Sequence, residues 1–456
     1  MKKMRIFALF IAAALVVSLF GASLPAAALY ELPEGKELTA KSAVLVCLGT
    51  EKDKDIVLFE RNADAHVLPS ALVRVMVTLV ALDYIEEKGI DIDTATGTYD
   101  QSKYDLIAGT GLGTTMNYQA KETWTIKDLL NVSFIQTAAG AAVTLAVTLA
   151  GSHQAFVDRM NEKAEALGCT NTHFTNVHAA DQAGQYVSAR DMYLIAREAM
   201  DSPKFLNIAK QTQYTVHPVS GGQERTLPNL NDMIRPTSGD SYYKPMVFGR
   251  TGTTETGRNM VSLASDSGYD YIAVVLDTPL TDASGNRAAT YIDDTRMLYR
   301  WAFNSFAYTT VLNKNEPAAE LAVNLAWETD KVSLVPKEDF STVVEAQMSS
   351  TAIRKEIIKY KDSVDAPVEK GTVYGKVELY INLNEKIGEV ELVAAESIEA
   401  SQVLVVWAKV KAFLTSPWFF GALILLAVLL IGYIVLNIIH NRKRKRRKMK
   451  RIKKYK

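Results

Sequence analysis

The chain has 456 residues, of which 48% are hydrophobic and 22% charged, which is typical of a folded protein and excludes a collagen-like or wholly disordered chain. Basic and acidic residues number 51 each, but twelve of the basic ones lie in the last sixteen positions. Without those twelve and the three among the first five residues, 36 basic residues remain against 51 acidic ones, so the body is acidic. An acidic body argues against nucleic-acid binding. The 2 cysteines are too few for a disulfide framework or a zinc cluster, and we expect no metal and no cofactor.

The first 28 residues have the three parts of a secretory signal peptide. Basic residues at positions 2, 3 and 5 precede an apolar run at 6–20, and three alanines at 26–28 form a cleavage site. An uncleaved signal anchor is the alternative. In both cases the residues that follow are exported.

Residues 29–310 are predicted to form an α+β domain in which helices pack on an antiparallel sheet. The first elements are two short strands at 42–48 and 56–60, which flank a charged turn and form a hairpin. A helix is predicted to follow at 72–85, between a proline and a glycine.

The rest of this domain begins with an Ala-rich stretch at 128–150. It contains a glutamine and several threonines, which favour one core helix of a folded domain over a membrane span. Residues 247–264 and 271–277 are predicted to be adjacent strands, and residues 290–304 an amphipathic helix that closes the domain.

Residues 311–396 are predicted to form a small all-β domain. The pattern there changes to short alternating strands, at 320–327, 331–335, 373–383 and 387–395. No convergent set of titratable residues suited to catalysis occurs among them. A spacer or docking module is the simplest interpretation.

Three further segments complete the chain. Residues 397–416 carry apolar side chains at helical spacing, which predicts an amphipathic helix on the outer membrane surface. Residues 417–439 contain no charge and extend about 34 Å as a helix, enough to cross a bilayer. The positive-inside rule places the basic tail, 440–456, in the cytoplasm, where it touches anionic lipid, and leaves the body extracellular.

A series of short motifs runs through the exported body, at 61–64, 125–130, 168–174, 184–192 and 249–252, followed by 366–371 and 388–394. In order and spacing this series resembles the D-alanyl-D-alanine carboxypeptidases, the low-molecular-mass penicillin-binding proteins that trim cell-wall stem peptides. The resemblance implies a penicillin-binding-protein or β-lactamase-like transpeptidase domain followed by a small all-β domain. It also implies peptidoglycan stem peptides, or a wall-synthesis protein, as partners.

The first catalytic motif of that family, S-x-x-K, is absent. Its serine attacks the peptide carbonyl, and its lysine takes the serine proton. Here the sequence is Pro69-Ser70-Ala71-Leu72-Val73-Arg74, which has Ala71 at the nucleophile's position and Arg74 at the base's position. Alanine has no oxygen to acylate, and arginine stays protonated.

The other two motifs, S-x-N and K-T-G, are also altered. The second reads Thr137-Ala138-Ala139, in which Ala139 cannot hydrogen-bond a substrate amide. The third survives in part as Arg250-Thr251-Gly252. We expect Arg250 to hold a terminal carboxylate and Gly252 to leave the strand open to a ligand. The alternatives are ordinary helix packing for the alanines and an exposed strand charge for the arginine.

Ser70 is the nearest hydroxyl to the lost nucleophile. It precedes Ala71 by one residue, about 100° around a helix, and Val73 occupies the position of its base. We expect Ser70 to be the N-cap of the following helix.

The loop around His178 departs from the family as well, because Ala179 follows that histidine where a glycine is usual. Together these changes predict an inactive homologue that binds muropeptide or a wall-synthesis partner. An active carboxypeptidase that uses displaced residues and a purely structural membrane protein are the alternatives.

Overall fold

The computed structural model describes residues 30–281, 284–285, 288–346, 353–381 and 385–452. The expected signal peptide therefore lies outside the described residues. The chain divides into two compact units, of which one runs up to Ala307 and includes Val343–Met348, while the other comprises Tyr308–Thr342 and Ser349–Lys456.

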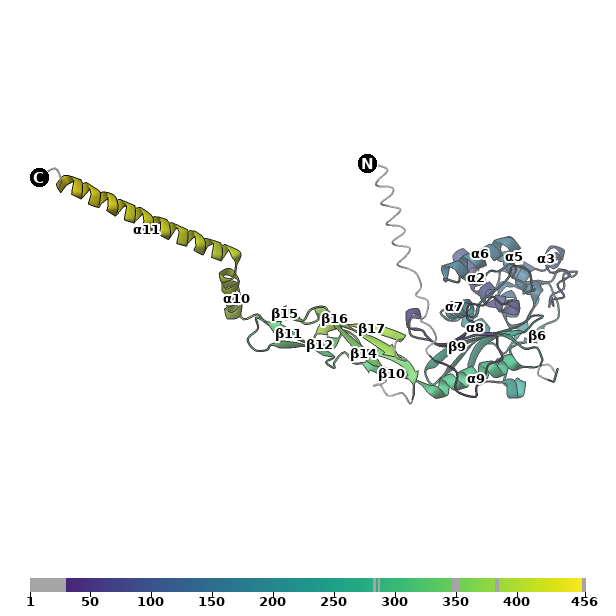
Figure 1. The fold of residues 1–456 in the computed structure, drawn as a ribbon. Helices are drawn as coiled ribbons and strands as arrows, with labels where there is room; N and C mark the ends of the chain where they lie inside the picture. The colour runs from purple at the N-terminus through teal and green to yellow at the C-terminus, as the bar shows by residue number, and fades with distance from the viewer. Residues whose placement is uncertain (1–29, 282–283, 286–287, 347–352, 382–384, 453–456) are drawn as a thin grey trace, which may run out of the picture. The chain divides into compact units, whose positions relative to one another are not determined.

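A five-stranded antiparallel sheet forms the centre of the first unit, in the order β2-β1-β9-β8-β7 (Figure 1). Its strands are β1 (Ser42–Cys47), β2 (Ile56–Arg61), β7 (Met246–Thr253), β8 (Arg258–Asp266) and β9 (Tyr269–Thr278). The hairpin predicted at 42–48 and 56–60 is confirmed. The single strand predicted at 247–264 is wrong, because the chain turns at Thr254, whose hydroxyl accepts hydrogen bonds from the backbone N–H groups of Thr256 and Gly257.

Helices cover both faces of this sheet. On one face α7 packs against β1 and β9, and on the opposite face α9 packs against β8 and β9 (Figure 1). The α-helices of this unit are α2 (Val73–Lys88), α3 (Gln101–Asp105), α4 (Ile126–Ile135), α5 (Ala139–Ala150), α6 (His153–Ala166), α7 (Ala189–Met200), α8 (Pro203–Ala209) and α9 (Thr290–Ser305). The helices predicted at 72–85 and 290–304 are thus confirmed as α2 and α9.

Short elements connect these layers. The 3-10 helices are η1 (Lys52–Lys54), η2 (Ser70–Leu72), η3 (Asp232–Ile234) and η4 (Pro236–Ser241). Two small antiparallel pairs are formed by β3 (Thr96–Thr98) with β4 (Thr123–Thr125) and by β5 (Gln213–Val216) with β6 (Arg225–Pro228). Among these, η2 begins directly before α2 and carries the first degenerate motif.

The single helix predicted at 128–150 is wrong, because the chain forms two helices, α4 and α5, with a break after Ile135. Gln136 is extended, with φ −110° and ψ 172°. The N–H of Ala139 donates to the carbonyl of Gly113 at 2.9 Å instead of continuing the helix. The prediction of a buried core segment is confirmed, because most side chains of α5 are fully buried.

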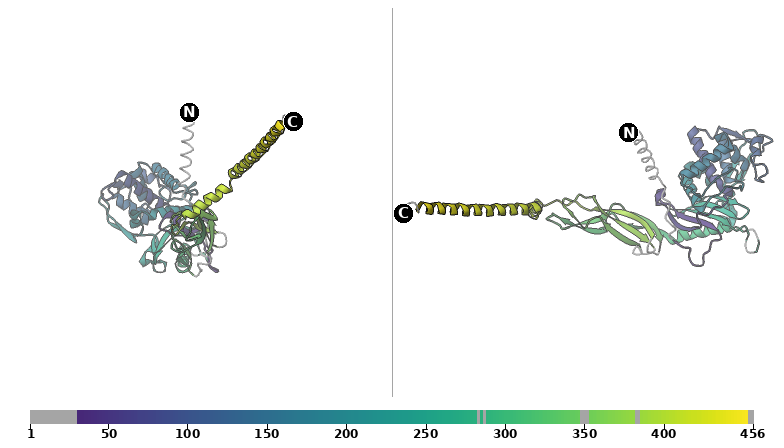
Figure 2. Two further views of the ribbon diagram at one scale, coloured as in Figure 1. Left: turned by 90° about the vertical axis from the view of Figure 1, so that its left-hand side faces the viewer. Right: turned by 45° about the horizontal axis from the view of Figure 1, so that its top comes forward.

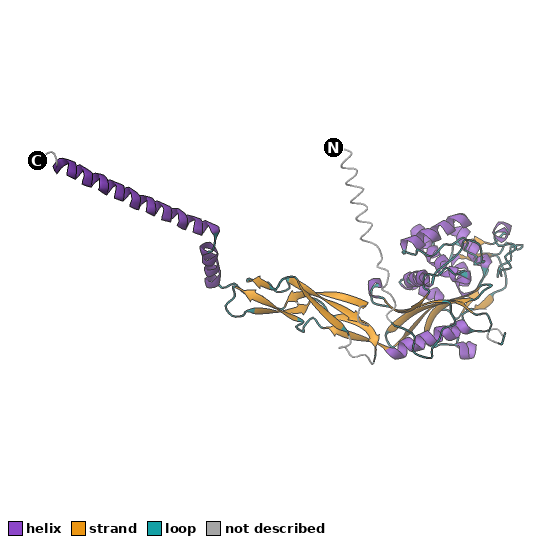
Figure 3. Ribbon diagram, in the orientation of Figure 1, coloured by secondary structure: helices purple, strands orange, loops and turns teal. Residues whose placement is uncertain are grey.

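The second unit is built mainly from strands (Figure 3). Its six-stranded sheet has the order β14-β16-β17-β12-β11-β15. The strands are β11 (Ala319–Asn324), β12 (Lys331–Pro336), β14 (Arg354–Lys359), β15 (Ser363–Asp365), β16 (Val373–Ile381) and β17 (Glu385–Ala394). A separate pair, β10 (Phe306–Leu312) and β13 (Phe340–Glu345), has residues in both units. An all-β module after the mixed unit is therefore confirmed.

Two helices, α10 (Gln402–Leu414) and α11 (Pro417–Ile452), end the described chain (Figure 2). Apolar side chains of α10 are exposed, including Trp407 at 58%. Within the described ranges, one helix contains a segment long and apolar enough to cross a membrane, Pro417–Lys445 of α11. This segment includes the apolar run predicted at 417–439. A bent pair, α5 and α6, passes the same length and composition test together, but α5 is part of the core.

A buried ion pair joins the first hairpin to α7. The Asp55 side chain, 1% exposed, accepts hydrogen bonds from the Tyr193 hydroxyl at 2.7 Å and from Arg197 Nε at 2.8 Å. It also accepts one from the backbone N–H of Gly49 at 2.8 Å. On the exposed side, Arg197 Nη1 pairs with Asp201 at 2.7 Å.

We expect Asp55→Ala to lower the free energy of unfolding of the ectodomain by about 3–5 kcal/mol, because it leaves the Arg197 charge without its buried partner. Asp201→Ala removes the exposed partner of the same arginine and should cost less than about 1 kcal/mol. Urea unfolding followed by tryptophan fluorescence measures both. Equal costs for the two variants would show that the buried pair does not stabilise the fold.

Candidate functional site

The three altered motifs meet at the side chain of Arg250, in β7. This side chain is 1% exposed. Its Nε donates to the carbonyl of Ala71 in η2 at 3.2 Å, and its Nη2 donates to the carbonyl of Gln136, at the break between α4 and α5, at 2.9 Å. The structure thus brings the first, second and third motif positions into one place.

Gly252 is required by the close approach of β7 to η2. A Cβ atom added there would lie 2.9 Å from the carbonyl oxygen of Pro69 and 3.1 Å from the backbone nitrogen of Ala71. Contacts that short would force one backbone segment to move. The role expected for Gly252, leaving space for a ligand, stays a prediction, since the segment that it faces in this structure is the chain's own η2. Thr251, between Arg250 and Gly252, is half-buried.

Arg74 is fully buried in the first turn of α2. Its Nη1 donates to the carbonyl of Val177, and its Nη2 donates to the carbonyl of His178 at 3.1 Å. Burial, helped by the positive charge of Arg250, lowers the pKa of Arg74 to about 9. The side chain is still protonated at neutral pH, so it cannot take a proton from a nucleophile.

Arg74 and Arg250 are two buried cations without a counter-ion. Among the described residues, neither guanidinium lies within ion-pair distance of a carboxylate, and Nε of Arg74 is buried without a hydrogen-bond partner. Burial also lowers the pKa of Arg250, to about 10. A buried charge that is compensated only by backbone carbonyls is costly, and an anion placed beside it would be bound favourably.

Ser70 is not the N-cap of α2, so that expectation was wrong. The N-cap position of α2 belongs to Leu72, and the Ser70 hydroxyl donates to the carbonyl of Thr253 in β7 at 2.8 Å. Its φ of 46° lies in the left-handed region, which is unfavourable for a residue with a side chain. The described structure therefore gives Ser70 no basic hydrogen-bond partner that would activate it.

The second motif segment is divided between surface and core. Thr137 is exposed at the break between α4 and α5, whereas Ala139 is fully buried at the start of α5. The neighbouring Gly140 is packed tightly, because an added Cβ would lie 2.7 Å from the carbonyl oxygen of Thr114. A small residue at 139 therefore suits the packing of α5.

The loop around His178 supplies partners that the sequence analysis missed. Arg74 is held by the carbonyls of Val177 and His178, and backbone atoms carry no residue signature. Burial, with His153 and Arg74 nearby, lowers the pKa of the His178 imidazole to about 4, so it is neutral at pH 7. Ala179 has φ 74°, which explains physically why a glycine is favoured at this position.

The described residues do not form a metal site or a reactive thiol. Among the residues that the structure describes, no group of three or more His, Cys, Asp or Glu side chains is placed to hold a metal ion. Cys169 is half-buried, and burial raises the pKa of its thiol, which opposes formation of a thiolate nucleophile.

Comparison with known proteins agrees with this arrangement of elements. The family described as D-alanyl-D-alanine carboxypeptidase matches residues 29–279, and the C-terminal domain of penicillin-binding protein 5 matches residues 306–400. The D-alanyl-D-alanine carboxypeptidase DacF of Bacillus subtilis is 26% identical over 354 residues, which cover 77% of this chain and 82% of that relative. The carboxypeptidase DacC of Escherichia coli is 27% identical over 375 residues, covering 80% and 86%.

Solved structures show the same fold. Penicillin-binding protein 5 from Haemophilus influenzae has a TM-score of 0.59 at 22% identity and covers 81% of this chain and all of its own. The carboxypeptidase DacD from Francisella tularensis has a TM-score of 0.62 at 19% identity, covering 84% and 99%. A mixed transpeptidase-like unit followed by an all-β domain, with the family match over residues 29–279, shows that this chain belongs to the D-alanyl-D-alanine carboxypeptidase family.

Proposed function

We propose that this cell-wall protein is a catalytically inactive, membrane-anchored member of the carboxypeptidase family. The observation that carries the proposal is the pair Ala71 and Arg74 at the positions of nucleophile and base. Ala71 offers no oxygen, and Arg74 is a buried cation whose Nη1 and Nη2 donate to backbone carbonyls. In serine hydrolases the loss of either the nucleophile or its base removes nearly all catalysis.

The alternative of an active enzyme would need Ser70 as a displaced nucleophile. The Ser70 hydroxyl donates to the Thr253 carbonyl and is 8% exposed. A carbonyl can accept the hydroxyl hydrogen but cannot remove the proton, so it does not activate the oxygen. The geometry around Ser70 therefore supports the inactive assignment.

We expect the ectodomain, residues 29–415, to form no covalent adduct with a fluorescent penicillin and to release no D-alanine from a D-Ala-D-Ala peptide. Gel fluorescence and intact-protein mass spectrometry measure the adduct. The double variant Ala71→Ser with Arg74→Lys restores both groups of the first motif and tests whether the scaffold itself still supports acylation.

A stoichiometric mass shift in the unaltered protein would contradict the inactive assignment. If that shift disappeared in Ser70→Ala but persisted in Ser133→Ala, a buried serine of α4 whose hydroxyl donates to the Leu130 carbonyl, Ser70 would be the nucleophile.

We further propose that the site retains weak affinity for the terminal carboxylate of stem peptides. The guanidinium of Arg250 is buried, lacks a carboxylate partner among the described residues and donates its hydrogen bonds to backbone carbonyls. A charge-assisted hydrogen bond contributes roughly 1.5–3 kcal/mol. After the entropy lost on association, one such contact yields only weak binding.

Peptides that end in D-Ala-D-Ala should accordingly bind with dissociation constants on the order of millimolar to high micromolar. Arg250→Ala and amidation of the peptide C-terminus should each weaken binding, whereas Arg250→Lys keeps the charge and serves as the control. NMR titration of the ectodomain measures all of these. If the amidated peptide binds equally well, or if neither peptide binds, the purely structural alternative is favoured.

For localisation we propose a single membrane pass by residues 417–439, with the boundaries 29–310, 311–396 and 397–416 for the preceding segments. The apolar side chains of α11 are exposed, as a lipid-facing helix requires, and α10 exposes apolar side chains next to it. The basic residues that follow favour a cytoplasmic tail.

Protease added to intact cells should digest the body and leave a tag on the C-terminal tail protected. After the membrane is permeabilised, the same protease should remove the tag, which shows that the tag is cleavable. Removal of the tag from intact cells would reverse the proposed orientation. Release of the body by high salt alone would contradict the anchor itself.

A further inference from the structure

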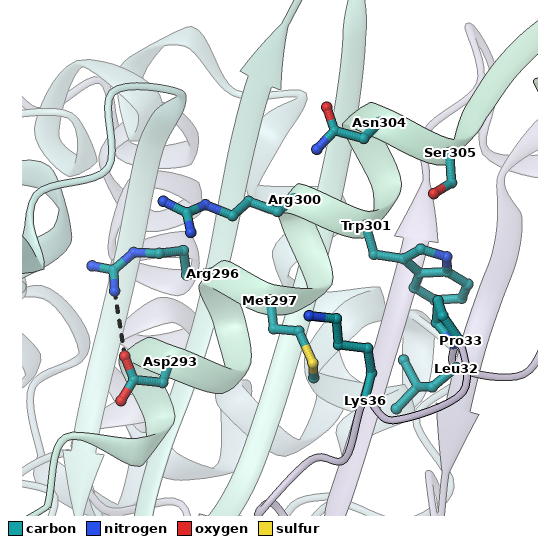
Figure 4. Close-up of a pocket in the computed structure, with 10 residues that line it drawn as sticks. All are labelled: Leu32, Pro33, Lys36, Asp293, Arg296, Met297, Arg300, Trp301, Asn304 and Ser305. Atoms are coloured by element: carbon teal, nitrogen blue, oxygen red, sulfur yellow. Dashed lines mark hydrogen bonds and ion pairs between the residues drawn. The ribbon is translucent and has the colours of Figure 1, made fainter.

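A pocket of about 510 Å³ lies in the first unit between the segment at 32–36 and α9 (Figure 4). Its volume is in the range of sites for small organic ligands. Because α9 covers the sheet face opposite to α7 and the other helices, this pocket is separate from the site around Arg250 (Figure 1).

Three cations line the pocket. Arg296 and Arg300 come from α9, Lys36 comes from the segment at 32–36, and Asp293 is the acid among the lining residues. The guanidinium of Arg296 already has partners within the protein, because it pairs with Asp293 at 3.3 Å and donates a hydrogen bond to the carbonyl of Asp240 at 2.5 Å. Lys36 and Arg300 are both exposed, and neither forms an ion pair with any residue that the structure describes.

The pocket also has an apolar wall, formed around Trp301. Figure 4 shows Leu32 and Pro33 beside the indole of Trp301, with Arg296 and Arg300 extending from α9 on the opposite side. Trp301 is 8% exposed and is fixed by edge-on contacts with Phe59 and Phe306, with ring centroids 6.4 and 5.1 Å apart. The indole of Trp301 is therefore held in place by aromatic packing.

The segment at 30–40, which lines one wall of the pocket, is hydrogen-bonded to the rest of the first unit at both ends. The backbone N–H of Tyr30 donates to the carbonyl of Leu58 at 3.1 Å. The buried Asp294 of α9 accepts hydrogen bonds from the backbone N–H groups of Thr39 and Ala40, at 3.2 and 2.8 Å. These hydrogen bonds attach the segment to β2 and to α9 on both sides of the residues that line the pocket.

From these contacts we propose that this pocket binds an amphipathic anion, in which a phosphate or carboxylate is attached to an apolar group. The anionic group pairs with Lys36 and Arg300, and the apolar group packs on Trp301. An organic cation would be repelled by the three cations, and inorganic phosphate would leave the apolar wall in contact with water. The proposal does not depend on whether the carboxypeptidase-like site is active.

Phenyl phosphate is the probe, because it joins a phosphate to an aromatic ring. The full chain is placed in nanodiscs of phosphatidylcholine, and binding is measured by calorimetry. We expect inorganic phosphate to bind at least about tenfold more weakly than phenyl phosphate, and phenyltrimethylammonium not to bind. A tenfold change corresponds to about 1.4 kcal/mol.

Lys36→Gln and Arg300→Gln should each weaken phenyl phosphate binding by about tenfold or more, while Lys210→Gln, which changes an exposed lysine of the C-cap of α8, leaves it unchanged. All three side chains are exposed, so the substitutions leave the core intact. Equal binding of phenyl phosphate by all variants, binding of the cation, or no binding of phenyl phosphate would overturn the proposal.

Repeating the titration in nanodiscs that contain phosphatidylglycerol identifies the source of the anion. If phosphatidylglycerol weakens the binding of phenyl phosphate, and Arg300→Gln abolishes that competition, the ligand is a lipid headgroup. Unchanged affinity supports a soluble phosphate or carboxylate.

Discussion

The buried guanidinium of Arg250 is the interaction on which the candidate site depends. It donates to the carbonyls of Ala71 and Gln136, which are 179 and 114 residues away in the chain. The Gln136 carbonyl follows the break in the helical segment, and Arg250 provides its hydrogen-bond donor. Without this side chain, η2, the α4–α5 break and β7 would lose their common contact, and an unpaired buried carbonyl would be costly.

Arg74 has a similar relation to the loop at 177–178. It occupies the position that the sequence analysis assigns to the family's base, and its hydrogen bonds link α2 to that loop. The two arginines repel each other, which contributes to the lowered pKa of Arg74. A site with two buried cations and no hydroxyl at position 71 is better suited to holding an anion than to cleaving a peptide bond. This combination underlies the proposed non-catalytic function.

Much of the architecture followed from local patterns. The hairpin of β1 and β2, the helices α2 and α9, the all-β second unit and the apolar segment of α11 each have a period or a length that can be read from residues alone. The break after Ile135 could not be predicted, because no proline interrupts the apolar run at that point. Contacts with Gly113 and Arg250, both distant in the chain, accompany it. Ser70 was misjudged for a similar reason, since its hydroxyl bonds to β7.

The sequence by itself determined the identity of the residues at the motif positions, and therefore the absence of a nucleophile at Ala71 and of a neutral base at Arg74. These are properties of side-chain chemistry and need no coordinates. Only the tertiary structure decided where the charges of Arg74 and Arg250 lie, which carbonyls hold them and that no described carboxylate accompanies them. It also decided that Lys36 and Arg300 line one pocket. Burial and long-range hydrogen bonds depend on how distant segments pack, and this information is not present in any local stretch of the chain.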